Sequence, residues 1–130
     1  MENWLERTQL LVGEDVIKIF SEFSVAVVGL GGVGAYAAEM LVRSGIGNIL
    51  ILDSDAVSIT NKNRQLLALE STLGHQKSEV MAQRLKDINP QLNLTVIDEY
   101  LTPENVEELL SPHKIDFLVE QVRQLREDNS

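Results

Sequence analysis

The sequence contains no cysteine, which excludes disulfide bonds, thiolate metal sites and a catalytic thiol within this chain. It also contains no apolar run that approaches the roughly 20 residues needed to span a bilayer. The first residues, MENWLERTQLLVGEDV, carry charges throughout and show no signal peptide. Together these absences predict a soluble, cytoplasmic protein that does not enter a membrane.

Basic residues are also scarce. Eleven Lys and Arg face twenty Asp and Glu, so the formal net charge of the 130 residues is −9. Bulk attraction to nucleic acid is therefore not expected, because such affinity depends largely on the neutralisation of phosphates. The length suits one domain, and a hydrophobic content of 44% is ordinary for a folded globular protein.

Strands and helices are predicted to alternate after an N-terminal helical segment in which Gly13 separates two short helices. Short apolar runs predict strands at 25–28, 49–52, 92–97 and 115–119. Helices are expected between them, at about 33–44, from about His75 to Ile88, and from Thr102-Pro103-Glu104 to near Ser111. This order predicts an α/β fold: a Rossmann-like, doubly wound and mostly parallel sheet. The expected division is a helical segment at 1–24, the Rossmann-like domain at 25–120 and a polar tail at 121–130.

A glycine-rich turn joins the first predicted strand to the helix that follows it. Gly29, Gly31 and Gly34 fit G-x-G-x-x-G, where they allow a tight turn, close approach to a phosphate, and packing of helix against strand. Asp53 ends the second strand and is placed to bind a ribose. The pattern predicts a nucleotide-binding site. The alternative is a glycine turn that only packs helix against strand. The motif alone does not distinguish a site for NAD from a site for ATP.

Two cations favour a triphosphate. Arg64 follows the second strand and Lys77 opens the second long helix, so both could neutralise charge as pyrophosphate leaves. The alternative is that both are solvated surface charges, as most Lys and Arg are.

At this point a family resemblance is visible. The segment VVGLGGVGAYAAEMLVRSGIGNILILDSDAVSITNKNRQ, followed by GHQKSEVMAQRLKDINP, resembles the adenylating E1-like family that includes ThiF, MoeB, HesA and the ubiquitin-activating enzymes. The N-x-N-R-Q form at 61–65 is most similar to the TcdA (CsdL) branch, the tRNA threonylcarbamoyladenosine dehydratases. The resemblance covers roughly residues 3–119.

The resemblance implies roles for individual residues. It assigns the ATP-cradling loop to Gly29, Gly31, Gly32 and Gly34, the ribose to Asp53, and a second acid to Asp55. It places Asn61, Arg64 and Lys77 at the phosphates. Arg7 matches an arginine that, in family dimers, reaches the ATP of the neighbouring subunit. The alternative is that Arg7 is an ordinary surface arginine.

The resemblance also implies a reaction. The family uses ATP and Mg²⁺ to adenylate a carboxylate, and the TcdA branch then cyclises threonylcarbamoyladenosine at position 37 of tRNA. Two alternatives stay open: an adenylyltransferase for a ubiquitin-like sulfur-carrier protein of thiamine or molybdopterin biosynthesis, and an NAD(P)-binding Rossmann module. The expected partners are ATP, tRNA or the carrier protein, and a second copy in a homodimer.

The family resemblance breaks down at the C-terminal end of the matched segment. Where the family has an Asp-x-x-Asp segment that helps to hold Mg²⁺-ATP, this chain has Glu120-Gln121-Val122-Arg123, and Arg123 has the opposite charge from the second Asp. Family members continue well beyond this point, so the chain is expected to be an N-terminal fragment whose sheet ends on an exposed edge strand. Weak ATP binding and poor turnover are the corresponding expectations, with no metal ligands assigned.

Overall fold

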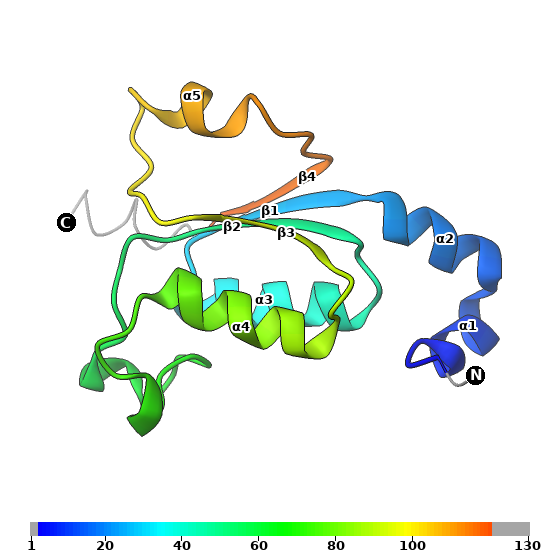
Figure 1. The fold of residues 1–130 in the computed structure, drawn as a ribbon, viewed down its shortest axis with the longest axis horizontal. Coiled ribbons are helices and arrows are strands. Elements are labelled where there is room, and N and C mark those ends of the chain that lie inside the picture. Colours follow the sequence, from blue (N-terminus) through cyan, green and yellow to red (C-terminus); the bar gives the residue numbers. More distant parts are fainter. Residues whose placement is uncertain (1–2, 121–130) are drawn as a thin grey trace.

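The computed structural model describes residues 3–120 as a central sheet with helices on both faces (Figure 1). The helices are α1 (Glu6–Val12), α2 (Glu14–Glu22), α3 (Gly32–Arg43), α4 (Lys77–Ile88) and α5 (Val106–Leu110). The strands are β1 (Ser24–Val28), β2 (Asn48–Leu52), β3 (Asn93–Ile97) and β4 (Phe117–Glu120). Two 3-10 turns, η1 (Ile59–Asn61) and η2 (Glu70–Thr72), lie in the long connection between β2 and α4.

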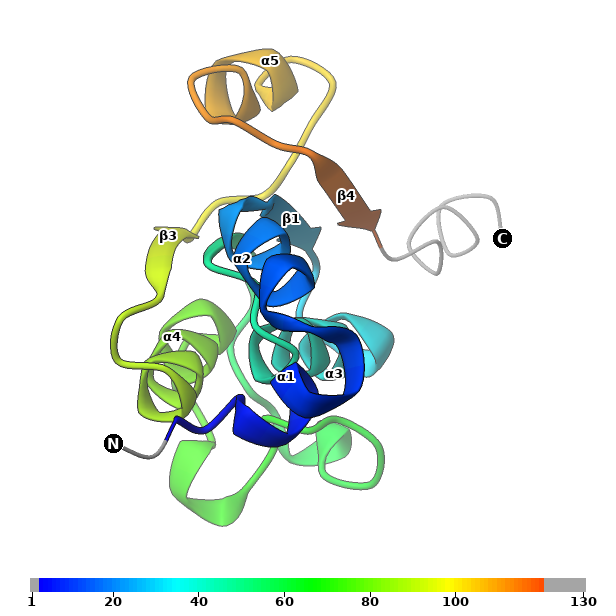
Figure 2. The same ribbon diagram turned by 90° about the vertical axis from the view of Figure 1, so that its right-hand side faces the viewer.

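The sheet has four strands in the order β3-β2-β1-β4, and every pair is parallel. The connections through α3 and α4 lie on one face, and the connection through α5 lies on the other (Figures 1 and 2). The chain therefore changes direction across the sheet between β1 and β4, and ligands of open α/β sheets bind at the carboxyl ends of strands at such a point. The predicted doubly wound α/β fold is confirmed.

Both faces of the two central strands are buried, which explains their unbroken apolar runs. One face packs on α3 and α4 through a core of Val25, Val27, Ile49, Ile51, Ala35, Ala38, Val42, Met81 and Leu85. The other face is covered by residues from the segment around α5, namely Leu101, Leu109, Leu110 and Ile115, which pack on Ala26, Val28, Leu50 and Leu52. The strands β1 and β2 are thus buried on both faces, and β1 leads directly into the glycine turn.

The N-terminal helices α1 and α2 lie beyond the amino ends of the strands, and Gly13 separates them as predicted (Figure 1). The end of α2 approaches the start of β2 so closely that a Cβ on Gly47 would lie 1.9 Å from the carbonyl oxygen of Ser21. Glycine is therefore required at position 47. Leu10 and Leu11 remain 81% and 87% exposed on these helices.

Several predicted boundaries differ from the structure by a few residues. The second long helix begins at Lys77, the third strand at Asn93 and the fourth strand at Phe117. The last helix begins at Val106 and not at Pro103. Thr102 and Asn105 do form the reciprocal bonds of a capping box: Thr102 N–H donates to Asn105 Oδ1, and Asn105 N–H donates to Thr102 Oγ1. The backbone of Asn105, at φ −111°, departs from helical geometry, so the regular helix starts only after it.

Strand β4 pairs with β1 alone among residues 3–120, so it is an edge strand in the described sheet. Phe117 and Leu118 are 57% and 52% exposed there. The predicted polar tail at 121–130 lies outside the described residues. Within residues 3–120, no helix combines the length and apolarity needed to cross a membrane.

Candidate functional site

The glycine turn lies at the carboxyl end of β1, as the sequence predicts. Gly29 has φ +92°, a conformation that side chains other than glycine rarely adopt, and its N–H donates to Leu52 O at 2.8 Å. Gly31 then caps α3 in an extended conformation, and the helix begins at Gly32. The first turn of α3 therefore presents backbone N–H groups and a partial positive charge at this edge of the sheet, an arrangement that suits a phosphate.

Asp53 fastens the glycine turn to the next segment. The residue is 8% exposed just after the end of β2. The Oδ2 atom accepts the N–H of Leu30 at 2.6 Å, and the Oδ1 atom accepts the N–H of Asp55 at 2.7 Å. The role predicted for this acid was ribose binding, and a carboxylate that accepts two N–H groups still has lone pairs for hydroxyl donors. Its contribution to holding the turn in place could not be predicted from the sequence pattern.

Lys77 is a buried cation at the same edge. The residue is 5% exposed as the first residue of α4, and its N–H donates to Asp55 O at 2.9 Å. The nearest carboxylate oxygen is Asp55 Oδ2, 4.0 Å from Nζ. Among residues 3–120 the ammonium donates no hydrogen bond. The side chain of Lys77 is thus largely buried while its charge has no hydrogen-bond acceptor among the described residues, so this position favours an incoming anion.

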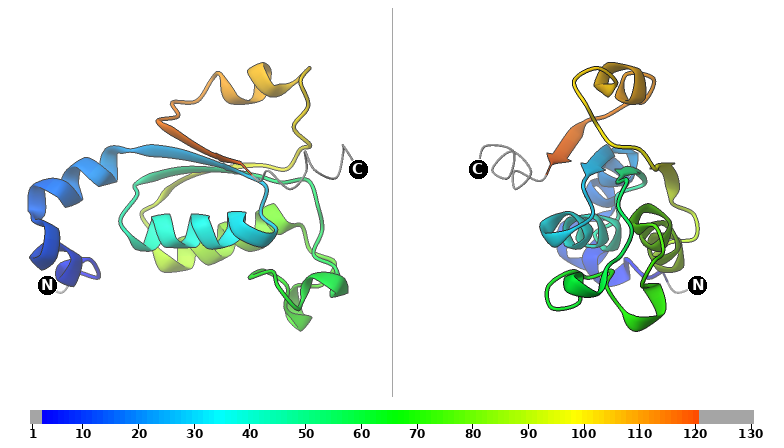
Figure 3. Two further views of the ribbon diagram at one scale, coloured as in Figure 1. Left: turned by 180° about the vertical axis from the view of Figure 1, so that it is seen from behind. Right: turned by 90° about the vertical axis from the view of Figure 1, so that its left-hand side faces the viewer.

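The predicted polar pair, Asn61 and Arg64, occupies the connection between β2 and α4, which lies beyond the carboxyl ends of the strands (Figures 1 and 3). Asn61 is 9% exposed, and its Oδ1 accepts the N–H of Ser58 at 3.0 Å, which closes the η1 turn. Arg64 is exposed, and its Nη1 donates to Thr60 O at 3.0 Å and Asn63 Oδ1 at 3.1 Å. The rest of the Arg64 guanidinium has donors left for a ligand.

Sequence reasoning missed two buried polar residues near this segment. Gln65 is 6% exposed and Ser78 is 0% exposed, and in the described part of the chain Gln65 Oε1 and Ser78 Oγ have no hydrogen-bond partner. Each is adjacent in sequence to a predicted cation, Arg64 or Lys77. Gln65 belongs to the N-x-N-R-Q motif and precedes an apolar run, and this was the signal available for its burial.

Arg7 does not join these residues within the chain. It is exposed on α1, at the end of the sheet where the strands begin (Figure 1). The side chain of Leu5 also lies at this end, next to Gly45 in the turn that precedes β2. Arg7 therefore lies at the opposite end of the sheet from the glycine turn.

Residues 3–120 bring together no group of three or more His, Asp or Glu side chains that could hold a metal ion. Asp53 is already engaged by two N–H groups. Arg123, which replaces the expected magnesium-binding Asp, lies outside the described residues.

An ion pair joins the helices α3 and α4 beneath the site. Glu39 accepts hydrogen bonds from Arg84 Nε on α4 and, at 3.2 Å, from Arg43 Nε on its own helix. The bond from Arg84 holds the pKa of the Glu39 carboxyl below its usual value, Arg43 adds to this effect, and partial burial opposes it. Glu39 and Arg43 lie four residues apart, a spacing that brings side chains together on one helix, whereas the contact with Arg84 joins residues that are distant in sequence.

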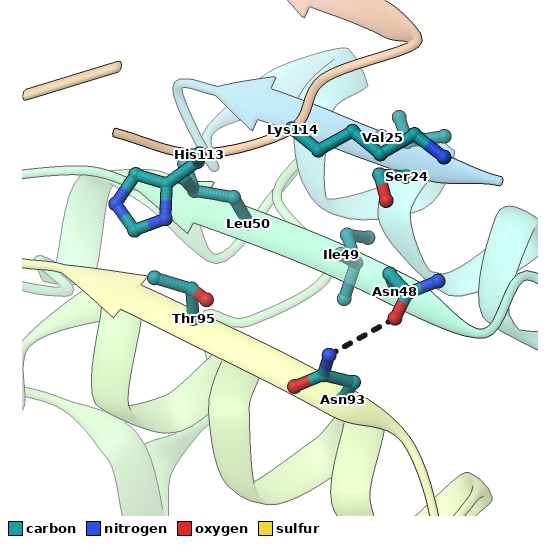
Figure 4. A pocket seen from close by; sticks show the side chains of 9 residues that line it. All are labelled: Ser24, Val25, Asn48, Ile49, Leu50, Asn93, Thr95, His113 and Lys114. Atoms are coloured by element: carbon teal, nitrogen blue, oxygen red, sulfur yellow. Dashed lines mark hydrogen bonds between the residues drawn. The ribbon is translucent and has the colours of Figure 1, made fainter. Parts of the chain in front are cut away.

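The opposite end of the sheet has a small polar hollow of about 150 Å³ (Figure 4). Ser24, Asn48 and Asn93 lie in register at the starts of three adjacent strands. Asn93 Nδ2 donates to Asn48 Oδ1 at 3.0 Å, and Asn48 Nδ2 donates to Phe23 O at 3.1 Å. These side chains therefore bind the end of α2 and each other.

The parallel sheet, the glycine turn that joins β1 to α3 and the change of direction between β1 and β4 place the chain in the Rossmann-like α/β class. The model of the ThiF family matches residues 5–122. The chain belongs to the ThiF family, and the predicted family resemblance is confirmed.

Similar proteins include the tRNA threonylcarbamoyladenosine dehydratases of Escherichia coli strain K12 and Bacillus subtilis strain 168. The first is 46% identical over 111 residues, which cover 83% of this chain and 41% of the relative. The second is 40% identical over 120 residues, which cover 92% and 47%. The E. coli molybdopterin-synthase adenylyltransferase is 34% identical over 103 residues, covering 79% and 40%.

The fold is similar to the crystal structure of E. coli tRNA N6-threonylcarbamoyladenosine dehydratase, TcdA, in complex with ATP. The TM-score is 0.86 at 41% identity, and the match covers 91% of this chain and 48% of that one. The chain thus spans about half the length of the relatives that it matches.

Proposed function

We propose that this chain binds ATP and takes part in the adenylation of a carboxylate, with residues 25–120 as the ATP-binding part. The observation that carries the proposal is Lys77, a residue that is 5% exposed and whose ammonium has no hydrogen-bond acceptor among the described residues, at the edge of the sheet where Gly29 turns. A phosphate would supply the missing acceptor. The TcdA structure with bound ATP supports the choice of nucleotide.

The chemistry follows from charge. An oxygen of the substrate carboxylate attacks the α-phosphorus of ATP, the bond to the bridging β-oxygen breaks, and pyrophosphate leaves with the negative charge. Lys77, Arg64 and the N–H groups at Gly31–Gly34 would stabilise the charge that spreads over the phosphate oxygens. Asp53 would bind the ribose while it holds the turn, and Asn61 would order the segment that carries Arg64. Mg²⁺ is proposed as a companion of the ATP phosphates, and none of these steps depends on a metal ligand from the chain.

The proposed acceptor is the threonylcarbamoyl group on adenosine 37 of tRNA. Once its carboxylate is adenylated, attack from within the same group closes a ring and releases AMP, which needs no protein thiol. Relatives named tRNA threonylcarbamoyladenosine dehydratase support this choice. The absence of cysteine is compatible with it, and a cytoplasmic location is part of the proposal.

A homodimer is the proposed assembly. Arg7 lies at the opposite end of the sheet from its own glycine turn, so it could serve an ATP site only in a second copy. The exposed Leu10 and Leu11 on the same helix give apolar area for such a contact. Size measurements with Leu11→Ser as the variant test this part: loss of a dimer is expected, and an unchanged mass contradicts it.

The second candidate is adenylation of a ubiquitin-like sulfur-carrier protein. The similarity to molybdopterin-synthase adenylyltransferase supports it at a lower identity, 34% against 46%. ATP–pyrophosphate exchange distinguishes the two acceptors. Exchange that depends on tRNA carrying threonylcarbamoyladenosine supports the first candidate, and exchange that depends on a carrier protein supports the second.

The first experiment is a thermal-shift titration with ATP and, separately, with NADH. A ligand that binds only the folded state raises the melting temperature with the logarithm of its concentration. A shift with ATP that Lys77→Met removes is expected. A shift with NADH alone would favour the NAD(P)-binding alternative and contradict the proposal.

A further inference from the structure

The buried ammonium of Lys77 has one anionic neighbour in the described chain, and the two groups differ in environment. The Lys77 side chain is 7% exposed, whereas that of Asp55 is 73% exposed, with 4.0 Å between Nζ and Oδ2. At that distance the carboxylate compensates charge without making a hydrogen bond. The ammonium therefore has no hydrogen-bond acceptor among the described residues, while its charge is partly balanced.

Main-chain hydrogen bonds hold Asp55 near Lys77, and the side chain of Asp55 takes no part in them. The Asp55 N–H donates to Asp53 Oδ1 at 2.7 Å, and Asp55 O accepts the N–H of Lys77 at 2.9 Å. Ala56 and Gln76 form a bridge just beyond. The carboxylate is thus held near Lys77 by main-chain bonds but is free to turn into water.

We propose that Asp55 is a resident counterion of Lys77, which anionic phosphates displace when a nucleotide binds. This inference rests on the proposed function, because it assigns Asp55 the role of competitor at the same site. A displaceable carboxylate makes binding selective for charge: an anion can replace it at Lys77, and a neutral nucleoside cannot. Asp55 would therefore lower the affinity for ATP and leave the affinity for adenosine unaffected.

The first test uses the full chain and calorimetric titration with ATP at low salt and without divalent metal. Asp55→Asn is expected to tighten ATP binding about two- to fivefold, the range for a partly exposed ion pair. Adenosine affinity should not change, and Asp55→Glu should behave like the wild type because it keeps the charge. The matched control is Asp98→Asn, which removes an exposed acid that follows β3 at the same edge.

The second test distinguishes the specific pairing of Asp55 with Lys77 from a general effect of net charge. In a buffer without multivalent anions, Asp55→Asn should lower the melting temperature, and pyrophosphate should restore it. The same substitution in a Lys77→Met background should have no effect on the melting temperature, as a double-mutant cycle requires of two coupled groups. Asp55 has an exposed side chain, so the variant is expected to fold.

Weaker ATP binding by Asp55→Asn would overturn the inference, because Asp55 would then contact the ligand. Equal effects of Asp55→Asn and Asp98→Asn, or an effect that persists without Lys77, would also overturn it. If the wild type binds ATP but Asp55→Asn changes nothing, the inference fails and the proposed function stands. If pyrophosphate rescues Asp55→Asn but the wild type does not bind ATP, the counterion stands and the proposed function fails.

Discussion

The two ends of the sheet differ in how their polar side chains are hydrogen-bonded. At the amino end, Asn48 and Asn93 bond each other, and Asn48 also bonds Phe23 O at the end of α2. At the carboxyl end, Lys77 donates no hydrogen bond, and Gln65 Oε1 has no partner among residues 3–120. Polar groups that satisfy one another stabilise a fold, whereas buried groups left open are expected where a ligand completes the site. The comparison therefore locates function at one end and stability at the other.

Substitution of Lys77 should have the largest effect. Lys77→Met should weaken ATP binding about 100-fold, because a charge-assisted contact to phosphate is lost. The melting temperature without ligand should not fall, since the change removes a poorly paired buried charge. Calorimetry and thermal unfolding provide the two readouts.

The control for Lys77→Met is Lys86→Met on the same helix. Lys86 Nζ is already bonded to Leu92 O at 2.7 Å, and the side chain lies near the other end of α4. ATP affinity should change little in this variant. Equal losses in the two variants would show that net charge, and not the buried ammonium, governs binding.

The amino end should respond in the opposite manner. Asn48→Ala leaves the carbonyl of Phe23 without its donor and removes the acceptor of Asn93 Nδ2. The free energy of unfolding should fall by about 2 kcal/mol, the scale of lost partly buried hydrogen bonds. Denaturant titration measures this, and ATP affinity corrected for the folded fraction should be unchanged. A specific loss of ATP affinity would contradict the division between the two ends.

The sequence predicted the parts of this comparison that depend on local pattern. Gly29, Asp53 and Lys77 could be placed at one edge because the carboxyl ends of parallel strands meet there. The burial of Gln65 and the polar row at the amino end depend on register between strands, which single-strand patterns do not fix. The bond of Arg84 to Glu39 joins residues 45 positions apart, and no helical spacing reveals it.

The pair between α3 and α4 gives a smaller, pH-dependent effect. The pKa of Glu39 is lowered in the folded state, so its stabilisation is present above the unfolded pKa of about 4.3 and is lost as the pH falls through the folded pKa. Glu39→Gln should lower the free energy of unfolding at pH 7 by about 1 kcal/mol, and by progressively less as the pH falls from about 4.3 through the folded pKa. Urea titrations over that pH range test this. A difference from the wild type that does not shrink on acidification would contradict it.

The smallest expected effect concerns Ser78, next to the buried lysine. Its Oγ is enclosed without a partner in the described chain, so the hydroxyl gives up hydration and gains no bond. Ser78→Ala should leave stability unchanged or raise it by up to about 1 kcal/mol, also because alanine favours the helix. If this hydroxyl instead serves a bound nucleotide, the alanine variant should lose ATP affinity at unchanged stability. Titration of Ser78→Ala with ATP beside its unfolding curve decides whether the open groups at this end all serve the ligand, or whether Lys77 does so alone.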